Sequence, residues 1–122
     1  MTIKKLSLGS VQWGSFYGIS NNSGQTDTNE VSRILDKAYF EGIKIIDTAS
    51  TYGTAESVLG KHNLSLFSLL TKIPKFKTNI ITKLDSEDMI FKFNQSLKKL
   101  NLKSCYGLLL HQKEDIFKKG NE

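Results

Sequence analysis

The chain has 122 residues, of which 39% are hydrophobic and 24% charged, as in a soluble globular domain with its own core. It has no run of about 18 apolar residues, so we expect no membrane span. A lone cysteine, Cys105, excludes an intramolecular disulfide and a cysteine-rich metal site. The net charge of +5 comes from scattered lysines and one arginine, Arg33, without interleaved aromatics, so we expect no nucleic-acid partner. The first residues lack the apolar core of a signal peptide, which favours a cytoplasmic location.

Strand patterns alternate with helix patterns along the whole chain. In order, we predict a strand over 5–8, a turn-rich loop over 15–25, a helix from 27 that Gly42 ends, a strand over 44–47, a helix over 55–61 capped by Thr54, a strand over 66–72, a loop over 75–84, a helix from 85 or 86 to 100, a buried strand over 105–110, and the start of a helix over 114–119. Asp27 and Glu30 resemble a capping box for the first helix.

This alternation predicts an α/β fold in which helices cover a parallel sheet of four strands, as one domain over residues 1–122. Right-handed crossovers place the carboxyl ends of all four strands along one edge of the sheet. Ligands of such sheets bind at that edge, so the residues that end the strands are the candidates for chemistry.

Four polar side chains occur at or just after those strand ends. Asp47 ends the second strand, Tyr52 follows five residues later, Lys72 ends the third strand and His111 ends the fourth. A tyrosine is a possible proton donor, and a nearby ammonium would stabilise the phenolate that remains. A carboxylate would keep that ammonium in place, and an imidazole would donate a hydrogen bond to a carbonyl oxygen. Such a set polarises and protonates a carbonyl but needs a nicotinamide cofactor for hydride.

The same residues resemble the N-terminal part of the aldo-keto reductase family. The similarity runs from about Leu6 to His111 and comprises Leu8-Gly9-Ser10, Asp47-Thr48-Ala49 with Tyr52-Gly53, Glu56 to Gly60, Thr71-Lys72, and Leu108 to His111. The resemblance implies a (β/α)₈ barrel enzyme that reduces aldehydes and ketones with NADPH. The motif wording is similar to that of bacterial members associated with surface-polysaccharide or sugar-nucleotide pathways.

The resemblance also implies the roles of individual residues. Tyr52 is the implied general acid, with Asp47 and Lys72 as its partners and His111 as the group that orients the carbonyl. Gly9 and Ser10, together with Asp47, resemble the segment beside the nicotinamide. The sequence distinguishes neither NADPH from NADH nor one carbonyl substrate from another.

The chain departs from this family in length. A (β/α)₈ barrel needs about 250 residues, whereas these 122 residues supply parallel units that resemble its first half, truncated after the fourth strand. The family's phosphate- and adenosine-binding segments lie mostly in the second half. We therefore expect unpaired sheet edges, and either weak stability of the isolated chain or self-association through those edges. An inactive half-barrel, either a remnant or an oligomerising interaction module, is the main alternative to an enzyme, and a cofactor-sensing subunit is a third hypothesis.

Several further residues have two interpretations. Trp13 and Tyr17 follow the first strand and are candidates to line a substrate pocket, although packing within the loop is as compatible with the sequence. Lys83, in a second Thr-Lys pair, is a weaker rival to Lys72 because no comparable apolar strand precedes it. The two histidines, His62 and His111, lack partners at ligand spacing, so no metal site is predicted.

Overall fold

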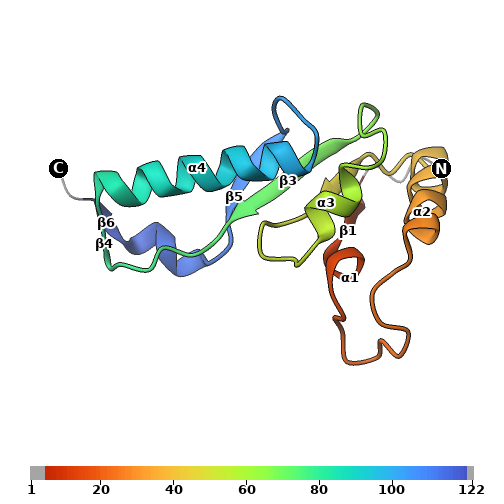
Figure 1. The fold of residues 1–122 in the computed structure, drawn as a ribbon, viewed down its shortest axis with the longest axis horizontal. Coiled ribbons are helices and arrows are strands. Elements are labelled where there is room, and N and C mark those ends of the chain that lie inside the picture. The colour runs from red at the N-terminus through yellow and green to blue at the C-terminus, as the bar shows by residue number, and fades with distance from the viewer. Residues whose placement is uncertain (1–4, 121–122) are drawn as a thin grey trace.

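A computed structural model describes residues 5–120 (Figure 1). Its elements are β1 (Ser7–Gly9), α1 (Val11–Gly14), α2 (Thr28–Phe40), β2 (Ile45–Asp47), α3 (Ala55–Leu59), β3 (Ser68–Ile73), β4 (Ile80–Ile81), α4 (Lys83–Lys99), β5 (Gly107–Leu110), the 3₁₀ helix η1 (Lys113–Phe117) and β6 (Lys119–Gly120). The predicted strands and main helices are present, with ends shifted by a few residues. The short α1 and the pair β4 and β6 were not predicted.

The main sheet has four strands in the order β1-β2-β3-β5, and every neighbouring pair is parallel. Gly9 is in register with Asp47, Asp47 with Leu70, and Lys72 with Leu109. The predicted α/β class is confirmed, as four consecutive parallel units of a partial barrel. All four strands therefore end along one edge, where Asp47 and Lys72 lie.

The main core lies between this sheet and the helices α2 and α3. Val31 and Leu35 form the buried stripe of α2, and they pack with Ile46 of β2 and Leu59 of α3, which are both fully buried. Strand β3 alternates strictly, with Leu69, Thr71 and Ile73 buried and the residues between them partly exposed. As a result Lys72 is on the other face of the sheet from this core.

The helix starts differ in detail from the prediction. Asp27 caps α2, but its side chain accepts from the backbone of Asn29, without a reciprocal bond from Glu30. The capping box instead starts α4, where the Thr82 and Asp85 side chains each bond the other's backbone N–H. The Thr82 hydroxyl donates to the Asp85 carboxylate and, with the Thr82 backbone N–H, lowers the pKa of Asp85. This cap begins α4 at Lys83, two residues before the earliest predicted start.

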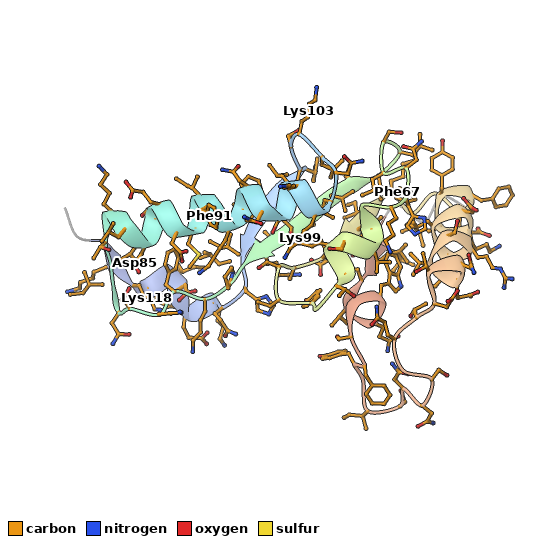
Figure 2. All side chains as sticks on the ribbon, in the orientation of Figure 1. Phe67, Asp85, Phe91, Lys99, Lys103 and Lys118 are labelled. Atoms are coloured by element: carbon orange, nitrogen blue, oxygen red, sulfur yellow. The ribbon has the colours of Figure 1, made fainter. Side chains whose placement is uncertain are left out.

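A small parallel sheet of β4 and β6 lies at the N-terminal end of α4 (Figure 1). Next to it, the buried Asp115 accepts from the Phe76 backbone N–H at 3.1 Å and from Lys118 Nζ at 2.9 Å, while Lys118 also donates to the Phe76 carbonyl. Burial alone would raise the pKa of Asp115, but these hydrogen bonds and the charges of Lys118 and Lys75 lower it. Figure 2 shows Lys118 and Asp85 at this end of the molecule. The predicted loop over 75–84 thus contains a strand, because η1 and β6 fold back onto it.

The prediction that the fourth strand is buried is wrong. Leu108, Leu109 and Leu110 of β5 keep 44%, 42% and 38% of their surface exposed. The cause is topological, since β5 pairs with β3 on one side and is the edge of the sheet on the other. Within residues 5–120, no helix combines the length and apolar character needed to cross a membrane.

Candidate active site

The sheet edge brings Asp47, Lys72 and Tyr52 into direct contact. Lys72 Nζ lies 2.6 Å from Asp47 Oδ2, 3.1 Å from the Thr48 carbonyl oxygen and 3.3 Å from the Tyr52 hydroxyl. The side chains of Lys72 and Asp47 are 16% and 29% exposed, so water screens this ion pair only partly. The ammonium also lies 4.9 Å from the centre of the Tyr52 ring.

The hydrogen-bond capacity of Lys72 determines what Tyr52 can do. An ammonium has three N–H donors and no acceptor, and the three oxygens around Lys72 match those donors. The Tyr52 oxygen therefore accepts from Lys72 and keeps its own proton for another partner. This arrangement would stabilise a phenolate after that proton had left.

His111 lies on the other side of Tyr52. The two rings meet edge to face with centroids 5.8 Å apart, and His111 Nδ1 lies 3.1 Å from the Thr51 hydroxyl oxygen. When Thr51 donates to Nδ1, the other ring nitrogen carries the hydrogen and is free to act as a donor. The Thr51 hydroxyl thus holds the His111 ring by one of its nitrogens, a contact that the sequence patterns did not indicate.

A cleft of about 310 Å³ opens next to these groups, and Val11, Ser15, Tyr17, Thr51, Tyr52 and His111 line it. Tyr17 lies where a substrate-contacting residue was predicted. Trp13 does not, because its side chain is only 4% exposed and packs in the main core. The expectation that Trp13 lines the substrate pocket is therefore corrected to its alternative, packing. The turn of α1 directs it inward, toward Val58 and Leu59, which belong to the same cluster.

Backbone contacts fix the loop that carries Tyr52. Gly14 at the end of α1 packs so closely that a Cβ there would overlap the Tyr52 carbonyl oxygen and the Ala55 nitrogen. Gly53 adopts a φ of +56° on the other side of this contact, in the left-handed region that favours glycine. Ser50 connects the loop to β3, because both its N–H and its hydroxyl donate to the Lys72 carbonyl oxygen, at 3.2 and 3.0 Å. The loop is thereby fastened to α1 and to the strand that carries Lys72.

A buried carboxylate supports the site from behind the sheet. Glu56 on α3 is 3% exposed, and its Oε1 accepts from the Thr71 hydroxyl at 2.8 Å. Thr71 immediately precedes Lys72. Glu56 lies in the first turn of α3, the helix that follows the Tyr52 loop. The Glu56–Thr71 hydrogen bond therefore joins α3, the helix that directly follows the Tyr52 loop, to the strand that carries Lys72.

We expect replacement of this carboxylate to destabilise the fold. Glu56→Ala leaves the buried Thr71 hydroxyl without its acceptor, at a cost of about 1–3 kcal/mol in the free energy of unfolding. Urea unfolding followed by circular dichroism measures this loss. Glu87→Ala is the matched control, because its exposed pair with Lys83 contributes about 0–1 kcal/mol. Equal losses in the two variants would contradict the coupling role.

The end of β1 forms the wall beside Asp47. A Cβ on Gly9 would meet no atom within 4 Å, so the backbone there is open to a flat ligand. Ser10 and Thr48, next to Gly9 and Asp47, are fully buried, and their hydroxyl oxygens have no hydrogen-bond partner. The open backbone of Gly9 beside the ion pair leaves room for the flat ring of a nicotinamide, whereas the buried Ser10 and Thr48 hydroxyls have no exposed surface that a ligand could contact. The three donors of Lys72 are directed to Asp47, Thr48 and Tyr52 and leave none for a phosphate, so this fit extends only to the nicotinamide end.

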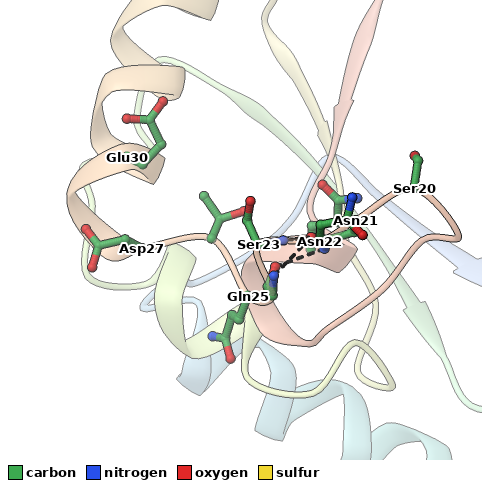
Figure 3. Close-up of a pocket in the computed structure, with 10 residues that line it drawn as sticks. Ser20, Asn21, Asn22, Ser23, Gln25, Asp27 and Glu30 are labelled. Carbon is green, nitrogen blue, oxygen red and sulfur yellow. Dashed lines mark hydrogen bonds between the residues drawn. The ribbon is translucent and has the colours of Figure 1, made fainter.

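A second hollow, of about 590 Å³, lies between the loop after α1 and the first turn of α2 (Figure 3). Its lining is polar and includes Ser20, Asn22 and Glu30, but none of the four strand-end residues. Asn21 closes this loop, with its amide nitrogen donating to the carbonyls of Tyr17 and Gly24. The hollow is therefore a consequence of a self-bonded loop beside the site.

Comparison with known proteins identifies the family. The family model described as "Aldo/keto reductase family" matches residues 5–117. The chain belongs to the aldo/keto reductase family. Among solved structures it is similar to PA4992 of Pseudomonas aeruginosa, described as an aldo-keto reductase, with a TM-score of 0.73, 25% identity, and coverage of 93% of this chain and 46% of that one. A second structure described in the same way, also from Pseudomonas aeruginosa, has a TM-score of 0.70 at 23% identity and covers 93% and 44%. A search of curated proteins returns no match.

The aldo-keto reductase chain described here corresponds to part of the solved structures. The chain spans a little under half the length of the solved structures that it matches. Within that span the model places Asp47, Tyr52, Lys72 and His111 around one cleft edge. Sequence reasoning missed the supporting roles of Thr51 and Ser50. The one signal in the sequence for Ser50 is that it lies between the second strand and Tyr52.

Proposed function

We propose that the chain carries the proton-donating site of an NADPH-dependent reductase of aldehydes and ketones, with Tyr52 as the general acid. One observation supports this most strongly: the three donors of Lys72 are directed to Asp47, Thr48 and Tyr52, which leaves the tyrosine proton free. The proposed setting is the cytoplasm.

The residues divide the work between them. Tyr52 donates its proton to the carbonyl oxygen of the substrate, and Lys72 stabilises the resulting phenolate across 3.3 Å. Asp47 keeps the ammonium charged and directed at the phenol. His111 donates from its free nitrogen to the same carbonyl oxygen, which polarises the carbonyl and orients it. Tyr17, at the opposite wall of the cleft, contacts the rest of the substrate.

The cofactor would lie against Gly9, Ser10 and Asp47. When bound, NADPH supplies the hydride that this chain's side chains lack. The open backbone at Gly9, where a Cβ would meet no atom within 4 Å, would leave room for the nicotinamide ring. The main competing function is that of an inactive half-barrel that acts as an oligomerising interaction module. The exposed leucines of β5 favour this alternative.

An NADPH titration of the purified 122-residue chain tests the proposal. Trp13, the sole tryptophan, is buried in the core three residues after Ser10, so energy transfer from Trp13 to bound NADPH reports cofactor binding. We expect saturable binding and aldehyde-dependent NADPH oxidation. Binding without oxidation would argue for an inactive member, and no binding would overturn the reductase proposal for this chain. NADH titrated in parallel determines the preference between the two cofactors.

A further inference from the structure

The two edges of the main sheet are complementary to each other. Within residues 5–120, strand β1 has a neighbour only in β2, and β5 has one only in β3. Because all the strands are parallel, both free edges run in the same direction. Strand β5 could thus pair with β1 of another copy of the same sheet. The pairing would be parallel, as it is between β1 and β2, β2 and β3, and β3 and β5.

The side chains at the two edges are apolar on matching faces. Leu108 and Leu110 of β5 share the helix-covered face of the sheet with their register partners Thr71 and Ile73. On the same face of β1, Leu8 lies beside Ile46 and forms, with Ile34, Ala38 and Ile43, the apolar floor of a groove of about 360 Å³ against α2. Leucines at one edge would therefore meet an open apolar groove at the other.

The exposed surface of the chain indicates how much contact is missing. The accessible area is 8539 Å², whereas a compact monomer of 13.7 kDa exposes about 6,600 Å². The excess is about 1,900 Å² per chain, or about 3,800 Å² over two chains. Obligate homodimers bury about 2,000–5,000 Å² in total, and the excess lies within that range.

We propose that a second copy of this chain occupies both edges, so that two half-sheets close into one eight-stranded parallel barrel. A twofold axis along the barrel relates the copies, and β1 of each chain pairs with β5 of its partner. Such an interface is closed, because the two equivalent contacts use up both free edges of the main sheet in each copy. Both sets of strand-end residues would then lie at one mouth of the barrel.

The mass of the native 122-residue chain tests this proposal independently of any activity. We expect light scattering after size exclusion, and native mass spectrometry, to give twice 13.7 kDa. Leu108→Lys at the β5 edge and Ile34→Lys at the β1 groove should each shift the chain to monomer and weaken association by at least tenfold. Ile19→Lys is the matched control, because Ile19 is fully exposed in the loop after α1, and it should leave the dimer intact.

Cross-linking determines which edges meet and covers the case in which an edge variant does not fold. In a Cys105→Ser background, Leu8→Cys is combined with Leu108→Cys or with Leu110→Cys. We expect an intermolecular disulfide that joins the peptide of position 8 to that of position 108 or 110 from the other chain. A native chain that stays monomeric, aggregates without a discrete dimer, or dimerises unaffected by both edge variants and without that disulfide overturns the proposal. If the chain dimerises as expected but shows no reductase activity, only the proposed function is contradicted.

Discussion

Tyr52→Phe is expected to reduce carbonyl reduction by about 10²–10⁴-fold while leaving NADPH binding unchanged. The substitution removes one oxygen, which is both the proposed proton donor and the acceptor of a Lys72 hydrogen bond. The ring itself stays, with its edge-to-face contact with His111. A change in turnover therefore reports the loss of the hydroxyl proton and not a loss of ring packing.

The measurement is aldehyde-dependent NADPH oxidation, compared with cofactor titration on the same sample. Tyr106→Phe is the control, because that side chain is 73% exposed before β5 and lies outside the cleft lining. We expect its turnover to equal that of the native chain. If Tyr52→Phe kept full turnover, the general acid would have to be another group.

Gly14→Ala should destabilise the fold by about 1–3 kcal/mol, as overpacking at a close contact does. The added Cβ would overlap the carbonyl oxygen of Tyr52 and the nitrogen of Ala55, both of them backbone atoms that no side-chain rotation can move aside. Either α1 or the Tyr52 loop must shift. We expect a lower urea midpoint together with impaired turnover.

Gly9→Ala is the paired control for stability. A Cβ there meets nothing within 4 Å, so its free energy of unfolding should stay within about 0.5 kcal/mol of the native value. The same variant should weaken NADPH binding, because the open backbone beside Asp47 is where we place the nicotinamide. Equal destabilisation by the two alanines would show that the contact between Gly14 and the Tyr52 loop is not tight.

Local sequence patterns were sufficient for the elements that carry the main core. The stripe through Val31 and Leu35 predicted α2, and the apolar runs before Asp47 and Lys72 predicted β2 and β3. Alternation of strands and helices then implied parallel order, which placed the strand ends on one edge without any knowledge of distances. These inferences work because periodicity and crossover handedness are set by backbone geometry.

The parts that escaped prediction depend on contacts between distant residues. Helix α1 has only four residues, and it is held by the packing of Gly14 against the loop of Tyr52. Strands β4 and β6 have two residues each and exist because the Asp115 anchor folds the chain back onto Phe76. The burial of Trp13 has the same origin. For β5, the apolar run gave the strand correctly but not its exposure, which depends on what lies beyond the edge.

The two hydrogen bonds that Ser50 donates to the Lys72 carbonyl oxygen have a consequence for how the site responds to ligands. They fasten the loop that carries Tyr52 to the strand that carries Lys72, with the ammonium already directed at the phenol. Charge that appears on the tyrosine oxygen during a reaction would meet a dipole and a cation that are in position beforehand. If Tyr52 acts as the proposed general acid, this arrangement would keep the reorganisation energy of proton transfer small.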